Sequence, residues 1–149
     1  MNTTDGNETG LFLIDFYQGI DGPTLRIDTV LPEGLIVLRD GFVRLAHANF
    51  DRVQIETIAP GRIEHFSFME LINNDRILET GRSKEITLLK QTVRGPCFCW
   101  ARDSEGWIDC SMLVEKMITL GKPCHQYAGV VGRDDAVVEI AYQERAYRG

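Results

Sequence analysis

Four cysteines are the residues of this chain best suited to metal or redox chemistry: Cys97, Cys99, Cys110 and Cys124. Cys97 and Cys99 are two residues apart, so on a strand they would face the same side, and a hairpin could bring Cys110 close to Cys99. Zinc sites usually contain two CxxC-like knuckles, whereas this chain has a single CxC pair. We therefore expect no metal site and interpret the thiols as small buried hydrophobic groups. A redox or metal sensor that uses Cys97, Cys99 and Cys110 is the alternative.

The sequence contains no recognisable catalytic motif. It has no GxSxG elbow, no phosphate-binding loop and no HExxH pair. His47 and His65 fall in separate predicted strands, and nothing in the sequence brings them together. We therefore expect a non-catalytic binding protein and not an enzyme.

The composition of the 149 residues is that of one globular domain, with 44% apolar and 26% charged residues. Its 16 Lys and Arg against 22 Asp and Glu give a net charge of -6. This sign is wrong for holding phosphate backbones, so nucleic acid is not an expected direct partner. The sequence has no apolar run of about 18 residues, and it starts with a polar, acidic segment. We expect no membrane association, reduced thiols and a cytoplasmic location.

Residues 1–10 lack periodicity and predict a flexible tail, after which a strand is expected over 11–17 and another from Thr24. Asp40-Gly41, between two apolar runs, predicts a hairpin with strands over 35–39 and 42–47. Pro60-Gly61 predicts a second hairpin.

The second half of the chain mixes strand and helix signals. Ser67 and Glu70 have capping-box spacing, which predicts a short helix over 68–73. A strand over 84–93 and a hairpin around 103–106 are expected next. A helix should begin at Ser111 and stop at Gly121 and Pro123. For 134–148 the charge order favours a helix, although AVVEIAY also suits a strand.

Together these elements predict a mainly β fold with short helices. We expect one domain over 11–149, with an antiparallel, jelly-roll-like β-roll over 11–110 and C-terminal helices over 111–149.

Two short motifs in this order of elements carry a family resemblance. Met69-Glu70-Leu71 is followed, after a loop, by Gly81-Arg82-Ser83 and the strand ITLLK. The arrangement resembles the phosphate cassette in the cyclic-nucleotide-binding domain of catabolite-activator-type regulators, and the resemblance covers roughly Thr24 to Met117. The chain departs from the family at Met69, where the family has glycine, and at Arg62, where it has an acidic residue. We expect no counterpart of the family's DNA-binding winged helix, in which case the chain is either a stand-alone sensor domain or a fragment of a longer regulator.

The resemblance implies a ligand site and a mode of action. Glu70 and Leu71 would belong to the ligand-binding segment, Glu70 would hold a ribose hydroxyl, and Arg82 and Ser83 would hold the phosphate of a cyclic nucleotide. Ligand binding would reposition C-terminal helices at a homodimer interface. Without a ligand, Glu70 is a helix-capping residue and Arg82 an exposed arginine beside Glu79.

Two functional classes follow from the sequence. The first is a small-molecule sensor domain of the cyclic-nucleotide-binding type, with altered or lost ligand specificity. The second is a small acidic inhibitor of the immunity or anti-nuclease type, which docks on a basic protein without a small ligand. Its acidic patch would be formed by Glu56, Glu64, Asp134 and Asp135.

Overall fold

The computed structural model describes residues 10–19, 22–47, 51–73, 75, 85–128 and 137–144. Most of the predicted tail over 1–10 therefore lies outside the described residues. The elements along the chain are β1 (Phe12–Gly19), β2 (Gly22–Thr29), α2 (Pro32–Ala46), β3 (Arg52–Gln54), η1 (Ile55–Thr57), β4 (Gly61–Glu64), β5 (Phe68–Asn73), β6 (Glu85–Thr92), β7 (Gly95–Arg102), α3 (Ser104–Leu120), β8 (Cys124–Tyr127) and β9 (Val137–Tyr142).

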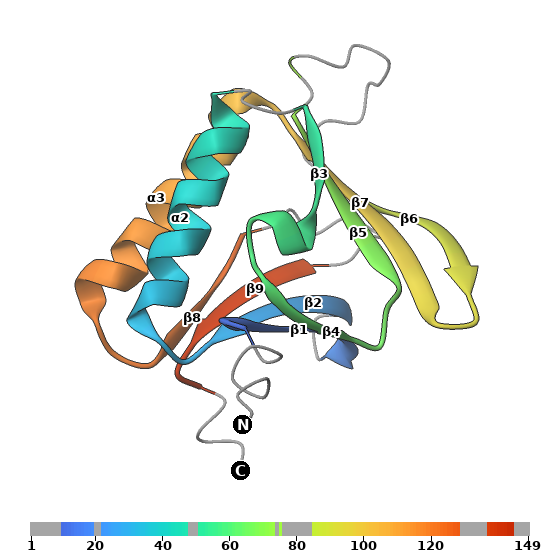
Figure 1. Ribbon diagram of the computed structural model, residues 1–149, viewed down its shortest axis with the longest axis horizontal. Helices are drawn as coiled ribbons and strands as arrows, with labels where there is room; N and C mark the ends of the chain where they lie inside the picture. Colours follow the sequence, from blue (N-terminus) through green and yellow to red (C-terminus); the bar gives the residue numbers. More distant parts are fainter. Residues whose placement is uncertain are drawn as a thin grey trace, which may run out of the picture.

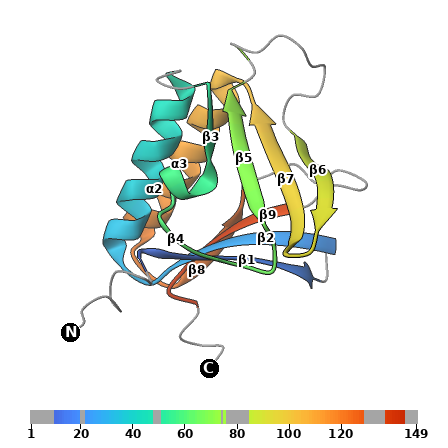
Figure 2. The same cartoon turned by 45° about the vertical axis from the view of Figure 1, so that its right-hand side comes forward.

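The strands form two sheets, one of five strands in the order β4-β1-β2-β9-β8 and one of four in the order β3-β5-β7-β6. Both are mixed, because β1 with β4, β2 with β9, and β5 with β7 pair in parallel. Figures 1 and 2 show α2 and α3 side by side, with the two sheets meeting at a steep angle beside them. The hydrophobic core fills the space between the helix pair and the inner faces of the two sheets.

The predicted mainly β fold with helices is confirmed, and so are several of its strands. β1 and β2 form the expected antiparallel pair, and β6 covers the strand predicted over 84–93. Neither helix is long and apolar enough to cross a membrane, as far as the described residues extend.

The hairpin predicted at Asp40-Gly41 is wrong, because this segment lies inside helix α2. The buried residues Leu35, Leu38, Phe42 and Leu45 recur with helical spacing, and Pro32 begins the helix with a φ angle that suits its first turn. Gly41 serves close packing instead of a turn. A Cβ atom there would lie 2.5 Å from Ile58 Cβ, so only glycine lets the helix approach η1 so closely.

The hairpin predicted at Pro60-Gly61 is also wrong, because β3 and β4 belong to different sheets. The chain passes through η1 and crosses from the four-stranded sheet to the edge of the five-stranded sheet. Gly61 is required there by a close approach, since a Cβ atom would lie 2.0 Å from the carbonyl oxygen of Phe12.

The segment 68–73 is strand β5 and not the predicted short helix. β5 lies inside the four-stranded sheet, between β3 and β7, where its backbone groups pair on both sides. The Ser67 hydroxyl contacts Thr92 Oγ1 at 2.5 Å instead of capping a helix. The strand pairing on both sides therefore prevails over the local capping pattern.

The hairpin predicted around 103–106 is instead the start of α3. Asp103 is the N-cap, and its side chain accepts a hydrogen bond of 2.7 Å from the backbone N–H of Gly106. The predicted stop is confirmed, since Gly121 ends the helix with a left-handed φ of 65°. The helix thus begins seven residues before the predicted Ser111.

The last predicted helix is wrong for the part that the structure describes. Residues 137–142 form β9, which pairs with β2 on one side and β8 on the other. All six residues of β9 are buried, as expected of a central strand in a mixed sheet. The two strands after α3 thereby complete the sheet that β1 and β2 begin.

Candidate functional site

The residues predicted to hold a cyclic nucleotide are not assembled into a site by the described part of the chain. Glu70 is on β5, where its carboxylate pairs with Arg52 at 3.7 Å, and the neighbouring Leu71 is fully buried in the core. Adjacent strand residues face opposite sides of a sheet, so Glu70 and Leu71 do not face one ligand. Arg82 and Ser83 lie outside the described residues. The nucleotide site implied by the resemblance stays a prediction.

The acidic patch proposed for an inhibitor is described only in part. Glu56 lies on η1, and Glu64, on β4, pairs with Arg62 at 3.0 Å. Asp134 and Asp135 lie outside the described residues, so this patch also stays a prediction.

None of the four cysteines, all of which the structure describes, forms a disulfide bond, and they lie in different environments. Cys97 and Cys110 are buried, and Cys110 Sγ accepts a hydrogen bond of 2.9 Å from Arg102 Nη1. Burial raises the pKa of the Cys110 thiol to about 11, so this group stays protonated at neutral pH. Burial also raises the pKa of Cys124. Among the described residues no cysteine joins a cluster with metal-ligand spacing.

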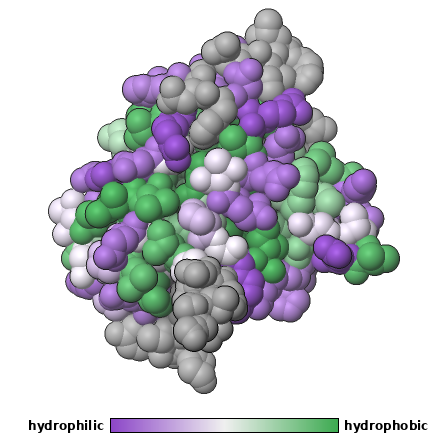
Figure 3. All heavy atoms as spheres, viewed as in Figure 1, coloured by the Kyte–Doolittle hydropathy of each residue, from purple (hydrophilic) through white to green (hydrophobic). Residues whose placement is uncertain are grey.

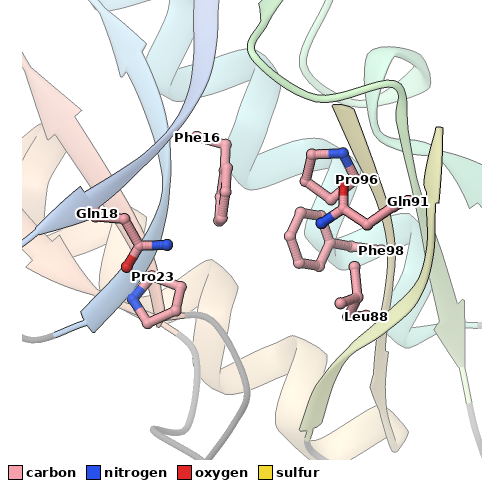
Figure 4. Close-up of a pocket in the computed structure, with 7 residues that line it drawn as sticks. All are labelled: Phe16, Gln18, Pro23, Leu88, Gln91, Pro96 and Phe98. Carbon is pink, nitrogen blue, oxygen red and sulfur yellow. The ribbon is translucent and has the colours of Figure 1, made fainter. Parts of the chain in front are cut away.

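A small cleft opens between the two sheets at the end away from the helices (Figure 4). Its volume is about 160 Å³. Phe16 of β1 faces Phe98 of β7 across it, with ring centroids 5.1 Å apart. The complete lining is Phe16, Gln18, Pro23, Leu88, Gln91, Pro96 and Phe98. The cleft is therefore mainly apolar, with two amide side chains.

Strand β6 borders this cleft and is an edge strand, because none of the described residues pairs with its outer side. Leu88 and Leu89 are 45% and 52% exposed, and Val93, in the following turn, is fully exposed. Figure 3 shows hydrophobic atoms at this end of the molecule. The strand register shifts between Leu88 and Lys90, so Leu89 is a bulged residue without a partner in the β6–β7 ladder.

The other side of the five-stranded sheet carries a buried charged cluster. Arg26 of β2 and Glu139 of β9 are register partners, and both are at most 5% exposed. The Arg26 guanidinium lies 3.6 Å from Asp28, 3.8 Å from Glu139 and 3.1 Å from Glu144. Tyr17 of β1 donates a hydrogen bond of 2.9 Å to Glu139. One guanidinium is therefore shared among three carboxylates.

This cluster was not predicted from the sequence, although a signal for it is present. In TLRID the charged residues alternate with apolar ones, which is typical of strands with one apolar and one polar face, and VVEIAY places a single glutamate in an otherwise apolar run. Because residues 134–148 were expected to be helical, Glu139 was not placed beside Arg26.

A second charged group lies at the β1–β4 edge of the same sheet. His65 Nδ1 is 2.6 Å from Asp15 Oδ1, which also accepts a hydrogen bond from the backbone N–H of Phe16. The hydrogen bond to Asp15, with the negative charge of the same carboxylate, raises the pKa of His65 above its usual 6.5.

We expect Asp15→Asn to lower the pKa of His65 toward 6.5, because the substitution removes the negative charge beside the ring. A raised pKa in the folded state means that the contact stabilises the protein below pH 6.5, and that this stabilisation is lost as the pH rises through the raised pKa. NMR titration of the imidazole resonances of both proteins measures the shift. Equal midpoints of the His65 resonances in the two proteins would contradict the contact.

No known protein-family profile matches this chain, and neither a curated protein nor a solved structure is significantly similar to it.

Proposed function

We propose that this chain is a non-catalytic binding domain that takes up an extended segment of a partner protein along strand β6. The observation that carries the proposal is a sheet edge to which none of the described residues pairs, with exposed Leu88 and Leu89, directly beside the apolar cleft. An edge strand presents unpaired backbone N–H and C=O groups, and another strand satisfies such groups best.

The size of the cleft favours a side chain of a protein segment over a complete small ligand. Pockets for small molecules usually enclose about 300 to 1,000 Å³, whereas this cleft has about 160 Å³. Phe16 and Phe98 provide apolar contact for one guest side chain, and the amides of Gln18 and Gln91 can bond the guest backbone. A strand added to β6 would supply both the apolar side chain for the cleft and the backbone groups for the two amides.

The bulge on β6 limits the length of the segment that can pair. A bulge interrupts the regular spacing of backbone groups and increases the local twist, which protects an exposed edge against indiscriminate pairing. Leu88 lines the cleft, and the bulged Leu89 is exposed next to it. We therefore expect a short segment with an apolar residue at the cleft to bind better than a long, uniformly apolar strand.

The experiment is a selection of random linear peptides on the complete chain, followed by fluorescence-polarisation titration of the enriched peptides. Leu88→Arg is expected to weaken their binding at least about tenfold, which corresponds to about 1.4 kcal/mol. Leu120→Arg is the matched control, because Leu120 is 50% exposed at the far end of α3. Its affinity should equal that of the unmodified chain.

Three outcomes would overturn this proposal. The first is that no peptide is enriched, or that both variants bind equally well. The second is a dimer that Leu88→Arg dissociates, since the edge would then be occupied by a second copy. The third is a saturable rise in melting temperature with cyclic AMP or cyclic GMP, which would favour the sensor class that the sequence resemblance implies.

A further inference from the structure

The charged cluster around Arg26 lies on the face of the five-stranded sheet opposite the cleft, so partner binding at β6 does not involve it. Tyr17 and Arg26 belong to the face of the five-stranded sheet opposite Phe16 and the core, because successive strand residues alternate between the two faces. His125 of β8 lies at the rim of this cluster, where 42% of its side chain is exposed. The cluster thus combines buried carboxylates with a ring that solvent can reach.

Each of the two glutamates in the cluster is oriented by a residue other than the histidine. Glu139 Oε1 accepts the hydrogen bond from Tyr17, and Glu144 Oε1 accepts one of 3.1 Å from Arg26 Nη2. Glu144 approaches His125 Nδ1 with both oxygens, Oε2 at 2.8 Å and Oε1 at 3.1 Å, and Glu139 Oε2 lies 3.9 Å from Nε2 of the same ring. Metal-binding carboxylates are commonly held in this way, with one oxygen on the ion and the other on an orienting residue.

The charges of the cluster favour a cation next to His125. Within the part of the chain that the structure describes, Arg26 is the only Lys or Arg paired with Glu139 and Glu144; its one charge cannot neutralise both, and the Glu139 side chain is only 6% exposed. A buried carboxylate without a compensating charge is strongly unfavourable. At least one further positive charge is therefore expected where the Oε2 atoms meet the histidine.

We propose that His125, Glu139 and Glu144 bind a divalent transition-metal ion such as Zn²⁺ or Co²⁺. One ligand atom from each residue lies within 4.8 Å of the others. Metal bonds of about 2.0 to 2.2 Å place two ligand atoms of one ion about 3 to 4 Å apart. The ion would use one nitrogen of the His125 ring, so the carboxylate beside the other nitrogen has to move toward the ion. One nitrogen with two carboxylates suits zinc and cobalt, whereas Ca²⁺ and Mg²⁺ prefer oxygen ligands alone.

The Asp15, Glu64 and His65 group has a similar composition but is a weaker candidate. The side chain of His65 is 68% exposed, and Asp15 Oδ1 already accepts a backbone hydrogen bond. Glu64 is neutralised by Arg62 at 3.0 Å. This group therefore has no buried excess of negative charge, and it serves as a comparison in the experiment.

The test is titration of the complete, chelator-treated chain with Zn²⁺ and with Co²⁺, followed by calorimetry and visible absorption. We expect one ion per chain. Substitutions His125→Ala and Glu144→Gln should each weaken binding at least about tenfold, and Tyr17→Phe, which frees Glu139 Oε1, about 10- to 100-fold. His47→Ala and His65→Ala should leave the affinity unchanged. Circular dichroism of each variant checks that it is folded.

Cobalt also separates this site from the thiols. Coordination by His125 and the two glutamates produces weak visible bands without the intense charge-transfer band of cobalt thiolates. Cys124→Ser should leave these spectra unchanged, although Cys124 precedes His125 in the chain. A thiolate band that Cys124→Ser removes, binding that His65→Ala abolishes, or full affinity in His125→Ala would each overturn the proposal. Absence of binding by the folded chain would do the same.

Discussion

Replacing Trp107 with alanine is expected to lower the free energy of unfolding by about 3 to 5 kcal/mol. Trp107 is fully buried on α3, where its ring stacks on Phe42 of α2 at 5.7 Å and meets Trp100 of β7 at 4.8 Å. Its indole N–H also donates a hydrogen bond of 3.0 Å to the carbonyl oxygen of Ile72. The substitution therefore leaves a cavity where both helices and the four-stranded sheet meet. Urea unfolding followed by circular dichroism measures the loss.

Two further variants show whether this loss comes from packing. Met112→Ala changes a residue on the same helix that is 56% exposed, so its effect should stay within about 0.5 kcal/mol. Trp107→Phe keeps an aromatic ring but removes the donor to Ile72, so an intermediate loss is expected. Equal stabilities of Trp107→Ala and Met112→Ala would contradict the position of Trp107 in the core.

Arg26→Met is expected to lower the free energy of unfolding by about 3 to 5 kcal/mol, because it leaves buried carboxylates without their counter-charge. Arg26 is 3% exposed, and Glu139 opposite it is 5% exposed. Methionine retains an unbranched apolar side chain, so loss of charge outweighs loss of packing. Denaturant unfolding at neutral pH measures the change.

A second substitution distinguishes charge from general damage at this position. Adding Glu139→Gln to Arg26→Met removes one of the stranded carboxylates and should restore part of the stability. Arg39→Met is the matched control, since Arg39 makes ion pairs of 3.1 Å with Asp40 and 2.8 Å with Glu115 at the surface, where solvent screens them. It should unfold almost as the unmodified chain does. A double variant no more stable than Arg26→Met would argue against the proposed charge coupling.

The two proposed sites lie on different faces of the five-stranded sheet and can be tested separately. Leu88 acts at the cleft between the sheets, whereas His125 and Glu144 act on the outer side of β8 and β9. We expect Leu88→Arg to leave cobalt binding unchanged and His125→Ala to leave peptide binding unchanged. Failure of one proposal would therefore leave the other standing.

The sequence by itself determined the elements whose signals are repeated along several residues. A nearly continuous apolar run predicted β1, the turn after it predicted β2, strand-like composition predicted β6, and the mainly β class followed from them. Gly121 correctly predicted the end of α3, because a left-handed residue at that position is nearly independent of the rest of the fold. Such patterns depend only on residues within one element, so they can be recognised from the sequence without the rest of the fold.

Only the tertiary structure decided the role of short motifs that suit more than one structure. Asp40-Gly41 suits a hairpin turn, but the helical spacing of Leu38 and Phe42 and the contact of Gly41 with Ile58 place it in a helix. Ser67 and Glu70 suit a helix cap, but strand pairing on both sides of β5 prevails. Local preferences of about 1 kcal/mol are smaller than the stabilisation from burying a complete element.

The candidate metal site depended on tertiary structure most of all. Arg26 and Glu139 are 113 positions apart in the sequence and become neighbours only because β2 and β9 pair in parallel. The sequence shows both residues as charged side chains within apolar segments, but no local pattern specifies which strands pair. Long-range pairing is selected by burial of the whole sheet face, and this is why the sequence alone contained the ligands but not the site.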